Sequence, residues 1–334
     1  MDYPLRLPRL VPNNPITDAE QRYQRQSTPP RRRFFQWFDR VGLVLILAAS
    51  WILFGGLLIA SLAGRDPTPI IDRLGSIPTY VTAIVTLWQF NLLFRTLQLS
   101  SSSIAREKEA QTWELLVLSG IDARRIVRGK WWATVQRQWS SFVWLGLARL
   151  GVVTLGGYSS VRFSSYYLDS NIHLPHPASV VLGGVVVFVL TLAALAFTAA
   201  CGIMGSAISQ RSAFALVRAI AIQIVLSLGP GLLAAFTLFL LVRSSTFYSS
   251  DLYSVMTGTA FTLIDNGSIL ASGLMSVLSP VTRAGLIISN ATLEVVPGDL
   301  MLAALLSLLM YAMLTWLALR LAERRAVSQM ALPV

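Results

Sequence analysis

The sequence predicts an all-α membrane protein, a polytopic helix bundle of about six spans. Of its 334 residues, 54% are hydrophobic and only 13% are charged. Its mean hydropathy of +0.61 is not that of a soluble domain. A helix needs about 20 mainly apolar residues to cross the hydrocarbon core of a membrane. The windows that meet this requirement are 41–62, 80–99, 139–158, 180–203, 213–242 and 300–321.

The segment before the first window differs in composition from the rest of the chain. Residues 1–33 are rich in Pro, Arg, Gln and Asn and have little apolar periodicity. Such a composition buries too little apolar surface to offset the entropy of folding. We therefore expect a mostly disordered cytoplasmic tail over 1–33, followed by one membrane domain over 34–334.

The basic residues predict the orientation of the spans. Arginines cluster in 31–40 and in 320–325, at the two ends of the membrane domain, and seven basic residues lie within 100–138. The positive-inside rule places such segments in the cytoplasm. We therefore expect a multi-pass protein of the inner (plasma) membrane with both termini cytoplasmic and 157–179 outside. The net charge is +11, and the basic residues lie beside the ends of the apolar windows. This placement predicts contact with membrane lipid and no nucleic-acid partner.

The segment 243–299, between the fifth and sixth windows, is too polar and interrupted for two clean spans, although 256–288 is largely apolar. It is expected to begin and end outside. We interpret it as short outer re-entrant helices. Two extra spans are the alternative, because they would leave the termini on the same side.

A block of charge follows the second window, in the stretch "IAREKEAQTWELLVLSGIDARRIVRGKWW" over 104–132. Residues 104–118 contain no Gly or Pro, so they are predicted to form one helix that stops at Ser119-Gly120. Asp122 can cap a second helix, with Ile121 and Ile126 at the spacing of a hydrophobic staple. The prediction is a helix-turn-helix at the inner membrane surface. Its glutamates disfavour contact with anionic lipid and favour docking to a protein.

The stretch "AREKEAQTWELLVLSGI" resembles the cytoplasmic signature of type-2 ABC exporter permeases. These typically read A-R-E-R-E-x-G-T-L-E-x-L-L-x-T-P-L, followed after several residues by G-K. Gln111 stands where that pattern has glycine, and Gly120 stands where it has proline. The segment "LSPVT" at 278–282 resembles the L-x-P-h-T segment that these permeases carry before their last span.

This resemblance implies that ABC ATPase subunits dock on the segment 100–138 and that the chain pairs with a second permease copy or a related permease. ATP and Mg²⁺ would then bind on the partner ATPase, and this chain would be non-catalytic, with no cofactor of its own. We expect Glu114 to meet the partner directly, and Glu107 and Glu109 to be rim charges. The residues that the resemblance assigns to ATPase coupling are Arg106, Glu107, Glu109, Thr112, Glu114, Leu116, Ile121 and Lys130.

Arg149 is the one charge near the middle of an apolar window. A charge at such a depth is costly and usually faces the bundle interior or a wet cavity. Two interpretations stand side by side: a contact for an anionic or amphipathic substrate, and a structural residue that hydrogen-bonds between helices.

Other function classes find less support in the sequence. The chain has only two histidines, His173 and His176, and two ligands do not close a metal site, so no metal is expected. Gly129-Lys130 lacks the spacing of a phosphate-binding loop. An ion-gradient-driven secondary transporter or channel is the alternative function. Such proteins usually carry ionisable carboxylates within their spans, and none is centrally placed in these windows.

Overall fold

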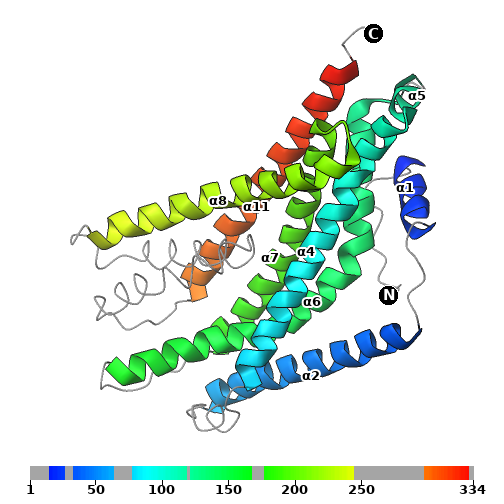
Figure 1. The fold of residues 1–334 in the computed structure, drawn as a ribbon. Coiled ribbons are helices and arrows are strands. Elements are labelled where there is room, and N and C mark those ends of the chain that lie inside the picture. Colours follow the sequence, from blue (N-terminus) through cyan, green and yellow to red (C-terminus); the bar gives the residue numbers. More distant parts are fainter. Residues whose placement is uncertain are drawn as a thin grey trace.

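The computed structural model describes residues 15–26, 33–63, 77–118, 121–167, 177–243 and 297–330, and every regular element in these ranges is a helix (Figure 1). The all-α class is therefore confirmed. Most of the predicted re-entrant region, 244–296, and both histidines lie outside the described residues. The helices are α1 (Pro15–Gln26), α2 (Arg33–Ala63), α4 (Ile77–Glu109), α5 (Thr112–Leu118), α6 (Ala123–Tyr167), α7 (Pro177–Ile208), α8 (Ser212–Arg243) and α11 (Pro297–Met330).

Each of the six apolar windows falls within a single helix. Two helical segments among the described residues are long and apolar enough to cross a membrane: the 25 residues Gly184–Ile208 of α7 and the 24 residues Leu305–Ser328 of α11. Val41–Gly56 and Ser212–Ser227 are shorter apolar segments. The structure thus gives two candidate spans, and the count of about six stays a prediction.

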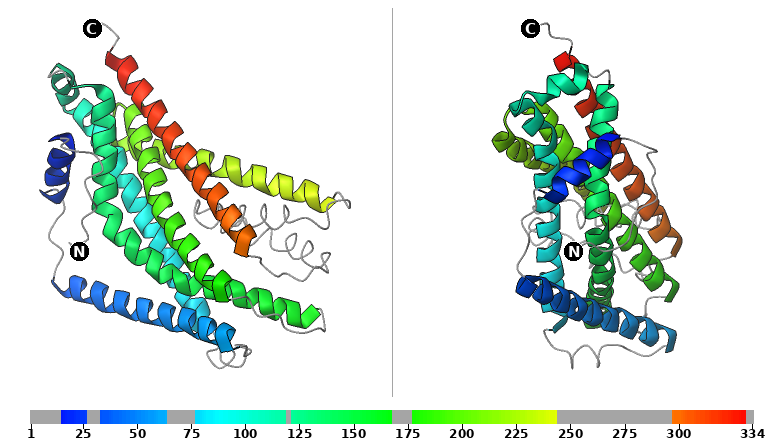
Figure 2. Two further views of the ribbon diagram at one scale, coloured as in Figure 1. Left: turned by 180° about the vertical axis from the view of Figure 1, so that it is seen from behind. Right: turned by 90° about the vertical axis from the view of Figure 1, so that its right-hand side faces the viewer.

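Helix α7 is the centre of the arrangement, and α4, α6, α8 and α11 all pack against it. Helices α4, α6 and α7 run side by side, whereas α2 and α8 run across their direction (Figures 1 and 2). The helices that contain the six apolar windows are therefore not all parallel to one another. Helix α2 packs chiefly on α6, where the Ser50 hydroxyl donates a hydrogen bond to the carbonyl oxygen of Ala148.

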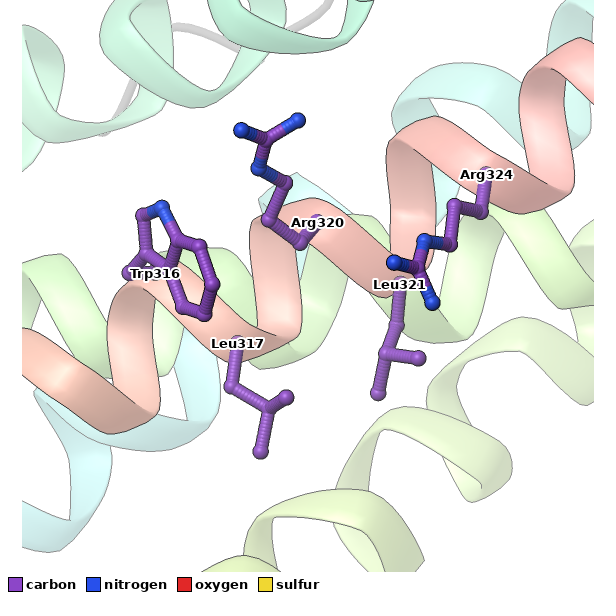
Figure 3. Close-up of a pocket in the computed structure, with 5 residues that line it drawn as sticks. All are labelled: Trp316, Leu317, Arg320, Leu321 and Arg324. Carbon is purple, nitrogen blue, oxygen red and sulfur yellow. The ribbon is translucent and has the colours of Figure 1, made fainter.

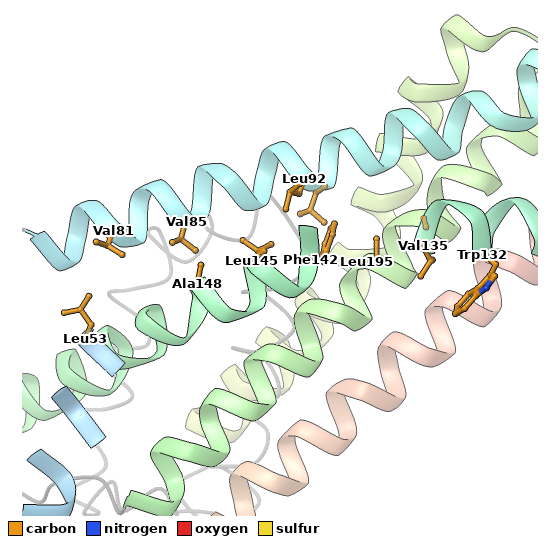
Figure 4. Close-up of a cluster of buried hydrophobic side chains, with 12 residues drawn as sticks. Leu53, Val81, Val85, Leu92, Trp132, Val135, Phe142, Leu145, Ala148 and Leu195 are labelled. Carbon is orange, nitrogen blue, oxygen red and sulfur yellow. The ribbon is translucent and has the colours of Figure 1, made fainter. Parts of the chain in front are cut away.

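The main apolar core lies between α4 and α6 and continues onto α7 (Figure 4). Val85 and Leu92 of α4 face Leu145 and Phe142 of α6, and Leu195 of α7 closes the cluster. Large apolar side chains also cover the outer faces of the helices, such as Ile52 of α2, Leu87 of α4 and Leu309 of α11. Contiguous exposed apolar surface is atypical of a soluble monomer and suits contact with lipid. Within lipid, close packing contributes more to helix association than the hydrophobic effect does.

Two glycines allow α7 to approach its neighbours closely. A Cβ atom at Gly205 would lie 2.7 Å from the backbone N and Cα of Ala219 on α8. A Cβ atom at Gly202 would lie 1.7 Å from the Ser100 hydroxyl oxygen on α4. Small residues at such crossings are the usual means by which membrane helices bring their backbones together. The contacts fix α7 against α4 and α8 near the end of the bundle that carries α5, which we call the α5 end.

The segment expected to be a mostly disordered tail contains helix α1. Pro15 begins this helix and Asp18 lies in its first turn, both favourable at a helix N-terminus. Ile16 is buried in the same apolar cluster as Ile126, and the Thr17 hydroxyl donates to the Gly129 carbonyl oxygen at 3.2 Å. Composition alone failed to predict this helix because its burial comes from docking on α6.

Candidate functional site

The charged block lies at the α5 end, where α4 and α6 continue past their apolar windows and α5 joins them (Figure 1). The helix predicted over 104–118 is interrupted: α4 ends at Glu109, and a turn at Ala110 and Gln111 precedes α5. Gln111 has φ 55°, a left-handed conformation that glycine adopts without strain. The predicted helix-turn-helix is thus an extension of two long helices joined by a short one.

The start of α6 follows the sequence prediction. The Asp122 carboxylate accepts a hydrogen bond from the Arg124 N–H at 3.1 Å, as a helix N-cap does. Ile121 and Ile126 belong to one apolar cluster. The predicted cap is confirmed, and the direct contact of a staple stays a prediction.

An ionic cluster of four side chains lies beneath this surface, with Arg106 3.7 Å from Glu20 Oε1 at its edge. The Lys130 ammonium, only 1% exposed, contacts Glu20 Oε2 at 2.9 Å and Glu107 Oε1 at 2.6 Å. It also donates to the Ser103 carbonyl oxygen at 3.1 Å. One cation on α6 therefore joins carboxylates from α1 and α4. Buried charges persist in proteins when they are paired in this way.

Glu107 is not the exposed rim charge that the sequence suggested. Its carboxylate is mostly buried, and its second oxygen has no hydrogen-bond partner among the described residues. Burial raises the pKa of Glu107 above its usual value, although the attraction of Lys130 opposes this shift. The Lys130 pair is internal because α1, which was not expected to fold, covers this side of α6.

Glu109 and Lys108 hold the connection between α7 and α8. Glu109 Oε2 accepts a hydrogen bond from the Ser212 hydroxyl at 2.6 Å, at the first residue of α8. The Lys108 ammonium donates to the Ala207 carbonyl oxygen at 2.5 Å, in the last turn of α7. The helix dipole makes the N-terminus partly positive and the C-terminus partly negative, so a carboxylate at the first and an ammonium at the second are both stabilising. Partial burial lowers the pKa of Lys108 to about 8.

The exposed part of the site is α5. Trp113 is buried and Leu116 is partly buried against the α4 and α6 cluster, whereas Leu115 is 66% exposed on the opposite face. The Thr112 hydroxyl donates to the Glu107 carbonyl oxygen at 3.2 Å, across the turn. Glu114 lies on α5, but its side chain is outside what the structure describes. The guanidinium of Arg106 lies 3.5 Å from the ring centroid of Tyr23 on α1.

Several residues of this end were not singled out in the sequence. Glu20 lay in the presumed tail and became relevant only when α1 packed on α6. Glu323 of α11 is 3% exposed and contacts Arg128 Nε of α6 at 2.6 Å. Ser206 of α7 accepts the Ile104 N–H at 2.9 Å. The one available signal was Glu323 itself, a single acid within the run "RLAERR".

Arg149 lies inside the bundle, 2% exposed, and its guanidinium donates to the Thr191 hydroxyl of α7 at 3.0 Å. Thr191 in turn donates to the Val187 carbonyl oxygen at 2.7 Å. Arg149 thus connects α6 to α7. This contact fits the interpretation of Arg149 as a structural residue that hydrogen-bonds between helices. Whether it also contacts a substrate stays a prediction.

The described residues contain no group of three or more His, Cys, Asp and Glu side chains suited to hold a metal ion. Comparison of the chain with protein-family models, with curated proteins and with solved structures finds no match.

Proposed function

We propose that this chain is the permease subunit of an ABC exporter, spanning the inner membrane about six times with both termini in the cytoplasm. Two such permeases, identical or related, would form the translocation pathway, and separate ABC ATPase subunits would dock on α5. ATP and Mg²⁺ belong to those partners in this proposal. The chain itself carries out no chemical step.

The observation that carries the proposal is the form of the α4–α5 connection. The segment resembling the permease signature forms an exposed helix at the end of two long helices, with its apolar Leu115 facing away from the bundle. The left-handed residue of the preceding turn is Gln111, at the position where the signature has glycine. Glycine is the residue that such a conformation favours. The backbone therefore supports the alignment at position 111, one of the positions where the residue type departs from the signature.

The distribution of charge supports the proposed orientation. Basic residues from three helices meet at the α5 end. Lys108 of α4 contacts the end of α7, Arg128 of α6 contacts Glu323 of α11, and Arg218 of α8 donates to the Ile208 carbonyl oxygen. Two of the segments that the positive-inside rule assigns to one side of the membrane, 100–138 and 320–325, thus lie together in the fold. We take this end as cytoplasmic.

The same contacts suggest how motion would pass from an ATPase to the membrane. A shift of α5 acts on α4 through the turn at Gln111 and on α6 through the packing of Trp113 and Leu116. Because Glu109 and Lys108 hold the α7–α8 connection, movement of the end of α4 carries α7 and α8 with it. Rigid helices with few alternative arrangements are suited to carry such coupling.

The test is assembly with an ATPase encoded beside this chain, co-expressed and co-purified. Glu114→Lys should strongly weaken the complex, because losing a buried charged contact at an interface costs about 2 to 5 kcal/mol. Leu115→Asp should also weaken it, because it places an unpaired charge in an apolar contact. Asp18→Lys, a charge reversal at an exposed residue of α1, is the matched control and should leave assembly intact. ATP turnover in liposomes should follow assembly.

Unchanged assembly and turnover in both α5 variants would remove the docking surface and the proposed function with it. Transport driven by an ion gradient in liposomes that contain no nucleotide would instead favour a secondary transporter.

A further inference from the structure

Helix α11 carries an open hollow of about 290 Å³ near its C-terminal end (Figure 3). Its lining residues are Trp316, Leu317, Arg320, Leu321 and Arg324, all from α11. They recur at intervals of one helical turn, so they form one continuous strip on the surface of the helix. The strip is apolar at its start and cationic at its end.

The position of the strip along α11 matches the boundary of a membrane. Residues 300–319 contain no charged side chain, and about 20 apolar residues cross the hydrocarbon core. Arg320 therefore lies where the hydrocarbon ends, and Arg324 lies one turn further, at the depth of the headgroups. Trp316 takes the place that tryptophan usually has, at the membrane interface.

Both guanidinium groups remain available to a ligand. Arg324 is exposed and has no acidic partner among the described residues. Arg320 is 44% exposed and lies 3.9 Å from Glu323 Oε2, while the other Glu323 oxygen is held at 2.6 Å by Arg128. The Arg320 guanidinium also lies 5.5 Å from the Trp316 ring centroid, which steadies its position without neutralising its charge.

We propose that this strip is a binding site for an anionic phospholipid of the cytoplasmic leaflet. The phosphate would lie between Arg320 and Arg324, and an acyl chain would run along Leu317, Leu321 and the Trp316 ring. Arginine presents several N–H donors in a planar fork that suits phosphate oxygens. The charge and the polarity gradient of the strip both fit a lipid, whereas a free phosphate would use the cationic half alone. The inference depends on α11 crossing the membrane and is independent of ATPase docking.

The experiment uses the full chain purified in an uncharged detergent and titrated with short-chain phosphatidylglycerol, with binding followed by native mass spectrometry. Short-chain phosphatidylcholine and glycerol phosphate are titrated in parallel. We expect saturable binding of phosphatidylglycerol at least tenfold tighter than that of either comparison compound. Arg320→Gln/Arg324→Gln should weaken the binding of phosphatidylglycerol about 30-fold, because each basic residue near a lipid headgroup contributes roughly fivefold.

The matched control is Arg22→Gln/Arg211→Gln, which removes the same charge from two exposed arginines, one on α1 and one between α7 and α8. It should leave the affinity for phosphatidylglycerol within about twofold of the original. Arg324→Gln alone, at a residue without an acidic partner, should weaken binding about fivefold and keeps the test decisive if the first double variant is unstable. An equal loss in the two double variants would overturn the site, because net charge would then account for binding. Glycerol phosphate binding as tightly as phosphatidylglycerol would overturn the assignment to a lipid.

Discussion

At the scale of single residues, Lys130 is the least exposed charged side chain in the described part of the chain. Its ammonium is nearly inaccessible and joins Glu20 of α1 to Glu107 of α4. Removing one member of a buried ionic group leaves the other charges without compensation, which is more costly than never having buried them. The resemblance to permeases marked Lys130 as a coupling residue, and its geometry makes it an internal tie on which coupling would depend.

Lys130→Ala is therefore expected to destabilise the protein by about 3 to 5 kcal/mol. Thermal unfolding of the detergent-solubilised chain, followed by circular dichroism, measures the effect. Arg124→Ala, at an exposed residue in the first turn of α6, is the control and should change stability by less than about 0.5 kcal/mol. Equal melting temperatures for the two variants would mean that the cluster is not formed.

Gln111 gives a second prediction at this scale. A non-glycine residue in the left-handed region costs about 1 to 2 kcal/mol relative to the right-handed one, and glycine avoids this cost. Gln111→Gly should therefore stabilise the chain by up to about 1 kcal/mol, whereas Thr112→Gly, within α5, should destabilise it by a similar amount. The two melting temperatures should shift in opposite directions, and a fall in both would show that residue 111 is helical.

At the scale of helices, the sequence predicted which segments are helical better than it predicted where each helix begins and ends. Apolar windows identified the helices because a run of about 20 apolar residues has few other structures available. The length of α6, from Ala123 to Tyr167, was not predictable from apolarity because its first part is charged and becomes helical by packing on α1 and α4. The break at Gln111 was missed because glutamine does not itself disfavour a helix, and its one signal was the glycine that the permease signature has at this position. Helix α1 was missed because its partner surface is more than a hundred residues away.

The crossing of α7 and α8 gives a prediction that belongs to this scale. Gly205→Ala should destabilise the chain by about 1 to 3 kcal/mol, because the added methyl group would meet the Ala219 backbone, which cannot rotate away. Gly55→Ala in α2 is the matched control, since nothing lies within 4 Å of the added atom there. Alanine has the higher helix propensity, so the control should be neutral or slightly stabilising. Similar melting temperatures for the two variants would contradict the close approach of α7 and α8.

At the scale of the whole molecule, the described ionic groups gather at the α5 end and large apolar side chains cover the outer faces of the helices. The α5 end holds the ionic groups of Lys130, Lys108 and Glu323, while the outer faces of α2, α4 and α11 expose large apolar side chains. A membrane accommodates this distribution when the apolar faces meet lipid and the α5 end meets water. The directions of α2 and α8 are the part of the fold that this reasoning did not predict. Hydropathy reports that a helix is apolar and says nothing of how it crosses its neighbours.

The orientation of the membrane domain gives the last prediction. In a Cys201→Ala background, a cysteine at position 115 should react with a membrane-impermeant thiol reagent only after the membrane is opened, because Leu115 is exposed at the α5 end and that end is proposed to be cytoplasmic. A cysteine at position 170, in the segment expected outside, should react in intact cells. Cys201 is buried, so its removal takes away background labelling without exposing a new surface. Labelling of position 115 from outside would reverse the orientation and leave an ATPase no access to α5.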